Sequence, residues 1–249
     1  IVEYVTANAS TAVFSAAPHG VSATMIDKLL TAAGQAGTQP RVVDISADFR
    51  FPTAGAYEAV YKHGHGAPGR LEQFTCAVPE HQNTLHTPHV AHPGCFATAI
   101  LLASVPLLSL GLVEPRLFVT GITGSTGSGR QPTAGTHHPQ RHSDLYSYNA
   151  LAHRHAPEVR ALALAASGVE AEINFVPHSG PFARGIHVTV QAVAREPLTS
   201  HELVHALRDY YDQSVFVRVT GQLPRVKDVV ASNFAQLSGV AHGDTVAVM

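Results

Sequence analysis

Residues 11–45 read TAVFSAAPHGVSATMIDKLLTAAGQAGTQPRVVDI, and this stretch decides the fold of the first part of the chain. The apolar run from Thr11 to Ala17 predicts a short buried strand, and the run from Arg41 to Ile45 predicts a second one. Between them, apolar residues recur at helical spacing, so we expect a helix that is capped by Ser22 and ends at Gly34. The order strand, helix, strand is typical of a parallel βαβ unit with a right-handed crossover.

The expected βαβ unit is half of a nucleotide-binding fold. Such folds place a glycine-rich turn after the first strand, where the turn and the following helix hold a pyrophosphate. That first strand and turn have no counterpart here, so residues 1–91 are interpreted as an incomplete Rossmann-type domain. Turn residues dominate residues 51–85, and the transition to the next domain is placed there or just after.

Residues 92–249 predict a second domain of the α+β class with a mixed, largely antiparallel sheet, because long strands alternate with few helices. A helix is expected from Phe96 to about Leu110. Thr199 and Glu202 form a capping-box pattern at the start of another helix, which is expected to end near Tyr211. The expected strands are 117–120, 170–175, 186–194, 215–219 and 244–249.

The composition and charge of the chain argue against several classes of partner. The chain has 249 residues, a formal net charge of -2 and no run of Lys or Arg, which argues against nucleic acid or a membrane surface as partner. No apolar stretch is long enough to span a membrane. With two cysteines and no signal-peptide pattern, a reducing cytoplasmic setting is expected. The chain begins at Ile1 and stops within an apolar run at Met249, and we interpret it as a segment of a longer protein.

Cys95 is the main catalytic candidate. It follows Pro93 and Gly94, which break the chain just before the expected helix, so the thiol is placed at a helix N-terminus. Unpaired amides and the helix dipole there favour the thiolate, the form that acts as a nucleophile. Cys76 lies inside an apolar run and is interpreted as a small buried residue.

Acyl chemistry on a thiolate needs a partner for proton transfer, which is usually a histidine. Of seventeen histidines, His153 stands out in the stretch HRHAPEV (153–159), and His178 is a second candidate in a turn after a strand. Neither His-Glu-x-x-His nor a paired Cys-x-x-Cys occurs, so no metal site is expected.

Anion binding is expected at a loop rich in glycine and hydroxyl groups. The loop GITGSTGSGR (121–130) follows an expected strand and ends in Arg130, so its amides and this cation are suited to a phosphate. Arg50 and Arg184 lie at strand ends. Each suits a bidentate grip on a carboxylate or phosphate, and each also suits a solvated ion pair.

Taken together, several ordered motifs resemble the N-acetyl-γ-glutamyl-phosphate reductases of the aspartate-semialdehyde dehydrogenase superfamily. The resemblance runs from about Val13 to Met249. The matching stretches are FSAAPHG (14–20), VDISADFRF (43–51), HPGCFATA (92–99), the 124–130 loop, HRHAPEV (153–159), FVPHSGPFARGI (175–186) and residues 221–233.

The resemblance implies a nucleotide-binding domain joined to a catalytic and dimerisation domain that uses NADPH. It makes Cys95 the nucleophile and His153 the acid/base. Substrate contacts are expected from Arg50, Tyr148, His178 and Arg184. Cofactor contacts are expected from Pro18, His19, Gly20, Ser125, Gly127, Gly129 and Arg130.

The implied reaction is reduction of N-acetyl-γ-glutamyl phosphate to the semialdehyde through a Cys95 thioester, in arginine biosynthesis, by a homodimer or tetramer. Two alternatives remain open. The stretch GTHHP (135–139) resembles the related lysine-biosynthesis reductases, which act on a carrier-protein-bound aminoadipyl phosphate. The incomplete nucleotide domain also fits a non-catalytic module that keeps only the substrate and oligomer surfaces.

Overall fold

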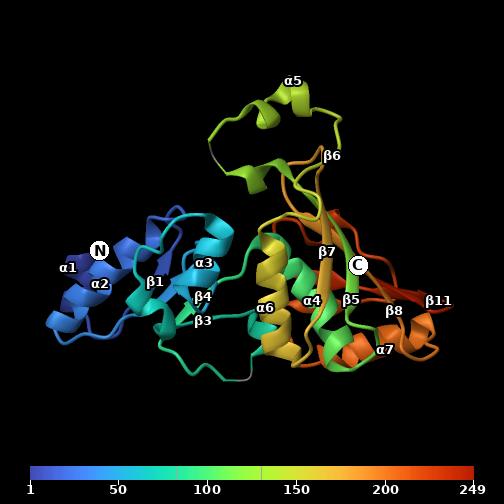
Figure 1. Cartoon of the computed structure of the whole chain (residues 1–249), viewed down its shortest axis with the longest axis horizontal. Coiled ribbons are helices and arrows are strands. Elements are labelled where there is room, and N and C mark those ends of the chain that lie inside the picture. The colour runs from blue at the N-terminus through green and yellow to red at the C-terminus, as the bar shows by residue number, and fades with distance from the viewer. Residues whose placement is uncertain (83, 130) are drawn as a thin grey trace. The chain divides into compact units, whose positions relative to one another are not determined.

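The computed structural model describes residues 1–82, 84–129 and 131–249 and divides the chain into two compact units, residues 1–94 and 95–249 (Figure 1). The expected domain boundary was residue 91, and the observed division follows residue 94. It falls at the turn that leads into the helix beginning at Cys95.

The first unit contains a four-stranded, all-parallel sheet in the order β1-β2-β4-β3. These strands are β1 (Ala12–Ser15), β2 (Arg41–Asp44), β3 (Phe74–Cys76) and β4 (His89–Ala91). Helix α2 (Ser22–Gln35) connects β1 to β2, so the expected βαβ unit is confirmed. The core of this unit lies between α2 and the sheet and includes Ile26, Val42 and Phe49.

The start of α2 differs from the expectation. Val21 is the N-cap and makes no side-chain capping bond, and the Ser22 hydroxyl instead donates to the Asp44 carboxylate at 2.6 Å. The Asp48 carboxylate takes the capping role from a distant turn, accepting from the amides of Gly20 (2.7 Å) and Ala23 (2.9 Å). A carboxylate here satisfies amides that a helix start leaves unpaired and complements the helix dipole.

Residues 51–85 contain more regular structure than expected. Helix α3 (Ala54–Tyr61) begins with the Thr53 hydroxyl accepting from the Ala56 amide, and Tyr57 is its only buried residue. One buried side chain in eight residues leaves no helical apolar period in the sequence, which is why the pattern did not indicate a helix. The remaining short elements of this unit are α1 (Val2–Ala7), η1 (Pro68–Gln73) and η2 (Pro79–His81).

The second unit is built on a six-stranded mixed sheet in the order β11-β12-β8-β5-β7-β6. Only β5 and β7 pair in parallel, and the other neighbours are antiparallel, as expected. The strands are β5 (Arg116–Thr123), β6 (Tyr146–Ser147), β7 (Glu172–Ser179), β8 (Ile186–Val193), β11 (Gly239–His242) and β12 (Thr245–Val248).

Helices pack on one face of this sheet. Helix α4 (Cys95–Ser109) packs against β8 and α6 (His155–Ser167), which in turn packs on β7, and α7 (Ser200–Tyr210) packs on β11 (Figure 1). The capping box at Thr199 and Glu202 is confirmed. The smaller elements are η3 (Ser125–Ser128), η4 (Ala134–Thr136), α5 (His138–Arg141), β9 (Val217–Val219), α8 (Val226–Val229) and β10 (Ala235–Leu237).

A close contact fixes how α4 approaches β5. A Cβ added at Gly121 would lie 2.5 Å from Phe96 Cε1, which would force the ring to shift, and 3.0 Å from Phe175 Cε2. Phe96 follows Cys95 directly and is fully buried. Because Gly121 lets the Phe96 ring reach the strand, the first turn of α4 is held against the sheet.

Candidate active site

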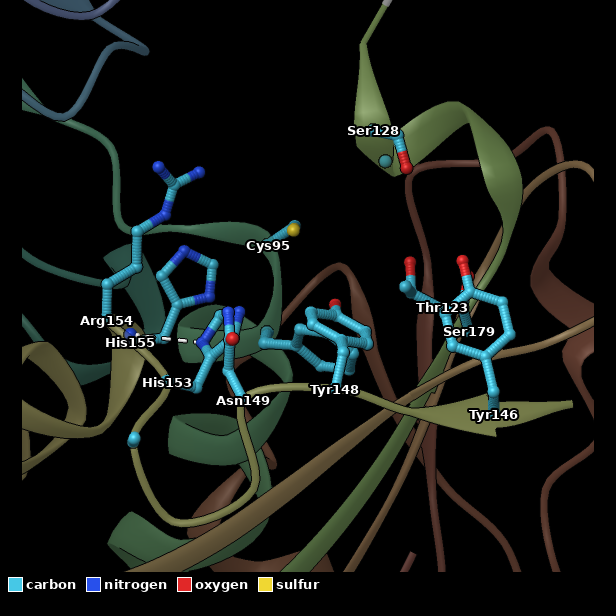
Figure 2. Close-up of a pocket in the computed structure, with 13 residues that line it drawn as sticks. Cys95, Thr123, Ser128, Tyr146, Tyr148, Asn149, His153, Arg154, His155 and Ser179 are labelled. Atoms are coloured by element: carbon cyan, nitrogen blue, oxygen red, sulfur yellow. Dashed lines mark hydrogen bonds between the residues drawn. The ribbon is translucent and has the colours of Figure 1, made fainter. Parts of the chain in front are cut away.

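A cavity of about 550 Å³ lies within the second unit (Figure 2). It is bounded by the first turn of α4, the end of β5, the segment before α6 and the end of β7. Its lining residues are Cys95, Phe96, Thr123, Gly127, Ser128, Tyr146, Tyr148, Asn149, Ala152, His153, Arg154, His155 and Ser179. Both predicted catalytic residues and Tyr148 therefore face the same space.

Cys95 is the first residue of α4 and is exposed to the cavity. Pro93 and Gly94 separate β4 from the helix, and the apolar residues from Phe96 onward are buried in the sheet-facing core. Burial of the helix body leaves its N-terminal residue at the surface of the pocket. Neither cysteine is in a disulfide, and Cys76 lies in β3 of the other unit.

His153 is buried, and its ring packs edge-on against Phe96, Tyr148 and Phe175. Its Nδ1 accepts from the His155 amide at 3.2 Å, so the neutral ring carries its proton on Nε2. Burial, and secondarily the charge of Arg154, lower the pKa of His153 from 6.5 to about 4. The ring is thus a neutral hydrogen-bond donor at physiological pH.

The pKa of Tyr148 reflects the charged groups around its phenol. Burial, the Cys95 thiolate and Tyr146 raise the pKa of Tyr148, whereas Arg154 and Arg141 lower it. Tyr148 therefore stays protonated, with positive guanidinium groups close enough to act on it. In Figure 2, Arg154 lies on one side of Cys95 and Ser128, Thr123 and Ser179 lie on the other.

The glycine-rich loop is held by the chain itself. The amides of Gly124, Ser125 and Thr126 donate to carbonyls of residues 182–185, and those of Gly127 and Gly129 donate within the loop. The cavity is reached by Gly127 and by Ser128, whose side chain carries a hydroxyl. Arg130 lies outside the described residues, and the predicted cofactor contacts of Ser125, Gly127 and Gly129 stay predictions.

Two predicted substrate residues, His178 and Arg184, are not among the described residues that line the cavity. Successive side chains of a strand point to opposite faces, so in β7 Ser179 faces the helix-covered side and His178 faces the other. Arg184 is exposed in the turn between β7 and β8. Their roles in substrate binding stay predictions.

The other predicted contacts belong to the first unit. Arg50 is buried there, and its guanidinium donates to the carbonyls of Ile45 and His92, each at 3.0 Å. After β1, the Gly20 amide donates to Asp48, and His19 Nδ1 accepts from the Ala47 amide at 2.8 Å. The substrate role of Arg50 and the cofactor roles of Pro18, His19 and Gly20 stay predictions.

Within the described ranges, His, Cys, Asp and Glu side chains form no group of three that is arranged to hold a metal ion. Over the same residues, no helix is both long and apolar enough to cross a bilayer.

The second unit matches a known family along its whole length. The model of the semialdehyde dehydrogenase dimerisation domain matches residues 95–249, which is well over half of the chain. The chain belongs to the semialdehyde dehydrogenase family. The match begins at Cys95, one of the residues that line the cavity.

Curated relatives of this semialdehyde dehydrogenase family member are named N-acetyl-gamma-glutamyl-phosphate reductase. The protein from Methanopyrus kandleri is 35% identical over 93% of this chain, and that from Dehalococcoides mccartyi is 35% identical over 88%. The chain spans 66% of the first relative's length and 64% of the second's. The resemblance stated from the motifs is confirmed.

Solved structures of semialdehyde dehydrogenases share the fold. Aspartate semialdehyde dehydrogenase from Francisella tularensis aligns with a TM-score of 0.67 at 10% identity, covering all of this chain and 78% of that one. Aspartate semialdehyde dehydrogenase II from Vibrio cholerae aligns at 0.64 and 14% identity, covering 96% of this chain and 72% of that one. The expected fold class, a parallel-sheet unit followed by a mixed-sheet α+β unit, is confirmed.

Sequence reasoning missed part of this semialdehyde dehydrogenase pocket. Arg154 and His155 were visible in the quoted HRHAPEV motif, but neither was assigned to the site. Thr123 and Ser179 lie within the stretches 121–130 and 175–186, but neither was given a role of its own, because each is an ordinary hydroxyl residue at a strand end. They become neighbours only when β5 and β7 pair in register.

Proposed function

We propose that this chain carries the chemistry of an NADPH-dependent acyl-phosphate reductase that converts N-acetyl-γ-glutamyl phosphate into the semialdehyde and inorganic phosphate. In this proposal it acts in the cytoplasm, in arginine biosynthesis. The observation that carries it is the shared cavity, where Cys95 begins a helix and His153 stands beside it as a neutral donor. The names of the relatives support the choice of substrate.

The first chemical step belongs to Cys95. Its thiolate attacks the carbonyl carbon of the acyl phosphate, the carbon–oxygen bond to phosphate breaks, and inorganic phosphate leaves. A thioester to Cys95 results. The N-terminal end of α4 favours the thiolate, and amides of this first turn are suited to stabilise the oxygen of the tetrahedral intermediate.

The second step reduces the thioester. A bound nicotinamide dinucleotide supplies the hydride. The thiohemiacetal oxygen then carries negative charge, and His153 donates a hydrogen bond to it from Nε2. Expulsion of the Cys95 thiolate forms the aldehyde. Because the burial of His153 keeps its ring neutral, this hydrogen bond is available without prior protonation.

The open parallel sheet of the first unit is of the type that binds dinucleotides. Open parallel sheets bind such ligands outside the carboxyl ends of their strands, and Pro18, His19 and Gly20 follow that end of β1. These residues would hold the cofactor. The start of α2 is already occupied by the Asp48 carboxylate, so phosphate contacts there would come from other groups.

The assay follows the reaction in the phosphorylating direction. With N-acetylglutamate semialdehyde, NADP⁺ and inorganic phosphate, the purified chain is expected to form NADPH only when phosphate is present. Activity with the carrier-bound aminoadipate semialdehyde instead would favour the lysine-type alternative. Absence of turnover, together with no change in NADPH fluorescence on titration, would favour the non-catalytic module.

We infer that the second unit forms a homodimer through the sheet face that its helices leave open. Phe118, Val193 and Val240 are 48%, 47% and 41% exposed on that face, although they lie on central and edge strands. An apolar face of this kind marks a protein interface. Sedimentation velocity is expected to show a dimer that Phe118→Arg converts to monomer, while Leu164→Arg on α6 leaves it intact.

A further inference from the structure

Arg141 is buried, although the other side chains of its segment are exposed or half-exposed. Within residues 131–147 every other described side chain is exposed or half-exposed, yet Arg141, at the end of α5, is only 7% exposed. The segment extends away from the sheet in Figure 1, and Arg141 reaches back to the end of β7. A long polar side chain is therefore buried where the local sequence is otherwise solvated.

The partners of Arg141 are neutral. Its Nη1 donates to the Ser179 hydroxyl at 2.6 Å, and its Nη2 donates to the Gly180 carbonyl at 2.5 Å. Within the described part of the chain, no carboxylate forms an ion pair with it. A buried cation without a countercharge is costly, so an anion that enters beside it is strongly favoured. The charge acts on the pocket, since it contributes to lowering the pKa of Tyr148.

Ser179 links the Arg141 guanidinium to the cavity. Its oxygen accepts from Arg141, so its own hydroxyl hydrogen is left to donate elsewhere. Ser179 lines the cavity, and Thr123, its register partner on β5, lines it too. Ser128 adds a third hydroxyl on the same side of Cys95 (Figure 2). Of these three hydroxyls, that of Ser179 is backed by the Arg141 guanidinium and that of Thr123 donates to the Gly124 carbonyl at a long 3.4 Å, and together they suit a tetrahedral oxyanion.

We propose that Arg141 and Ser179 form the subsite that binds the phosphate group during acyl transfer, with Thr123 and Ser128 completing it. Ser179 contacts the phosphate, and Arg141 is a positioning residue that polarises the Ser179 hydroxyl. The proposal rests on the proposed function, because it names where that reaction's leaving group is held.

The test compares the KM for phosphate with the KM for the aldehyde. In the phosphorylating direction, Ser179→Ala and Arg141→Gln are each expected to raise the KM for phosphate about tenfold to a hundredfold, because one charge-assisted hydrogen bond is lost. The KM for the aldehyde is expected to stay within about twofold, since uniform binding of that substrate is untouched. Arg141→Lys, which keeps the charge, should recover part of the phosphate affinity. The control is Arg195→Gln, a half-exposed arginine paired with Glu114.

Three outcomes would overturn the proposal. A rise in the KM for the aldehyde alone would make this a carboxylate subsite. A lowered unfolding temperature with unchanged phosphate affinity would make Arg141 only an anchor of its segment. Equal effects from Arg195→Gln would show a nonspecific charge effect.

Direct titration with inorganic phosphate by calorimetry keeps this proposal separate from the reductase proposal. If Arg141-dependent phosphate binding occurs without reductase turnover, the subsite stands and the proposed reaction fails. If turnover occurs and phosphate binding ignores both substitutions, the subsite fails and the reaction stands.

Discussion

Replacing Cys95 with serine is expected to lower phosphate-dependent NADPH formation by at least about a thousandfold, because a serine hydroxyl at this position is not ionised and cannot form the thioester. Cys95 is the first residue of α4 and is exposed in the cavity, and the substitution alters only its side chain. The fold is therefore expected to survive, and circular dichroism should match that of the unaltered chain. Turnover is measured from NADPH absorbance.

The matched control is Cys76→Ser, since Cys76 is the chain's other thiol and lies in the other unit. It is expected to keep most of the activity. Mass spectrometry of the chain mixed with acyl phosphate, without cofactor, should find the acyl group on Cys95 alone. Near-normal turnover of Cys95→Ser, or acylation of Cys76, would exclude the thioester mechanism.

His153→Asn is expected to lower kcat by roughly a hundredfold to a thousandfold and to change KM little, because its hydrogen bond is made to charge that develops in the transition state. Steady-state kinetics in both substrates measure this split. His205→Asn is the control, since His205 is exposed on α7 and pairs with Asp209. Parallel losses in kcat and in substrate affinity would reassign His153 to binding.

The lowered pKa of His153 also predicts a pH dependence. The folded value of about 4 lies below the unfolded value of 6.5, so between these pH values the unfolded chain binds more protons. The free energy of unfolding therefore falls as pH drops from about 6.5 to 4, by up to roughly 3 kcal/mol for this one residue. His153→Asn should flatten that slope in denaturant titrations. The kcat should stay level down to about pH 5, and a fall centred near 6.5 would contradict the neutral ring.

Elements with a strong apolar period were predictable from the sequence. The βαβ unit, the helix after Cys95 and the capped helix α7 were all confirmed, because burial of one face imposes a period that local sequence records. Helix α3 was missed because it buries a single residue, Tyr57. The capping of α2 by Asp48 was missed because the two positions are distant in sequence.

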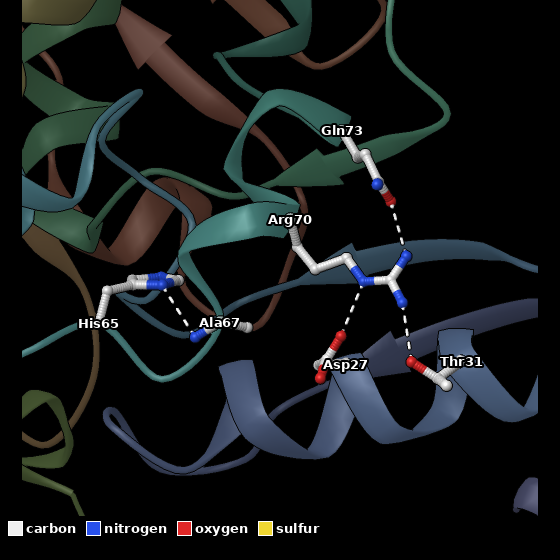
Figure 3. Close-up of polar contacts among 6 residues, drawn as sticks. All are labelled: Asp27, Thr31, His65, Ala67, Arg70 and Gln73. Carbon is white, nitrogen blue, oxygen red and sulfur yellow. Dashed lines mark hydrogen bonds and ion pairs between the residues drawn. The ribbon is translucent and has the colours of Figure 1, made fainter.

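Contacts between distant segments decide details of the first unit that no local pattern indicates. Arg70 in η1 donates to Asp27 at 2.8 Å, to Thr31 at 2.9 Å and to Gln73 at 3.3 Å, which fastens η1 to the side of α2 (Figure 3). Asp27 and Thr31 are one helical turn apart and so share a face. Before folding, nothing distinguishes Arg70 from a solvated arginine in a turn.

The sequence by itself determined the family, and it predicted a reactive thiol and a histidine partner because Cys95 and His153 each lie in a local motif with its own chemical meaning. Only the tertiary structure decided which hydroxyls and cations accompany them. Ser179 faces the cavity and His178 faces away because β7 pairs with β5 in one register, and Arg141 becomes a buried cation because its segment returns to that strand end. The register of β7 with β5 and the path by which the Arg141 segment returns to β7 both depend on burial of the whole sheet. No short stretch of sequence encodes that burial.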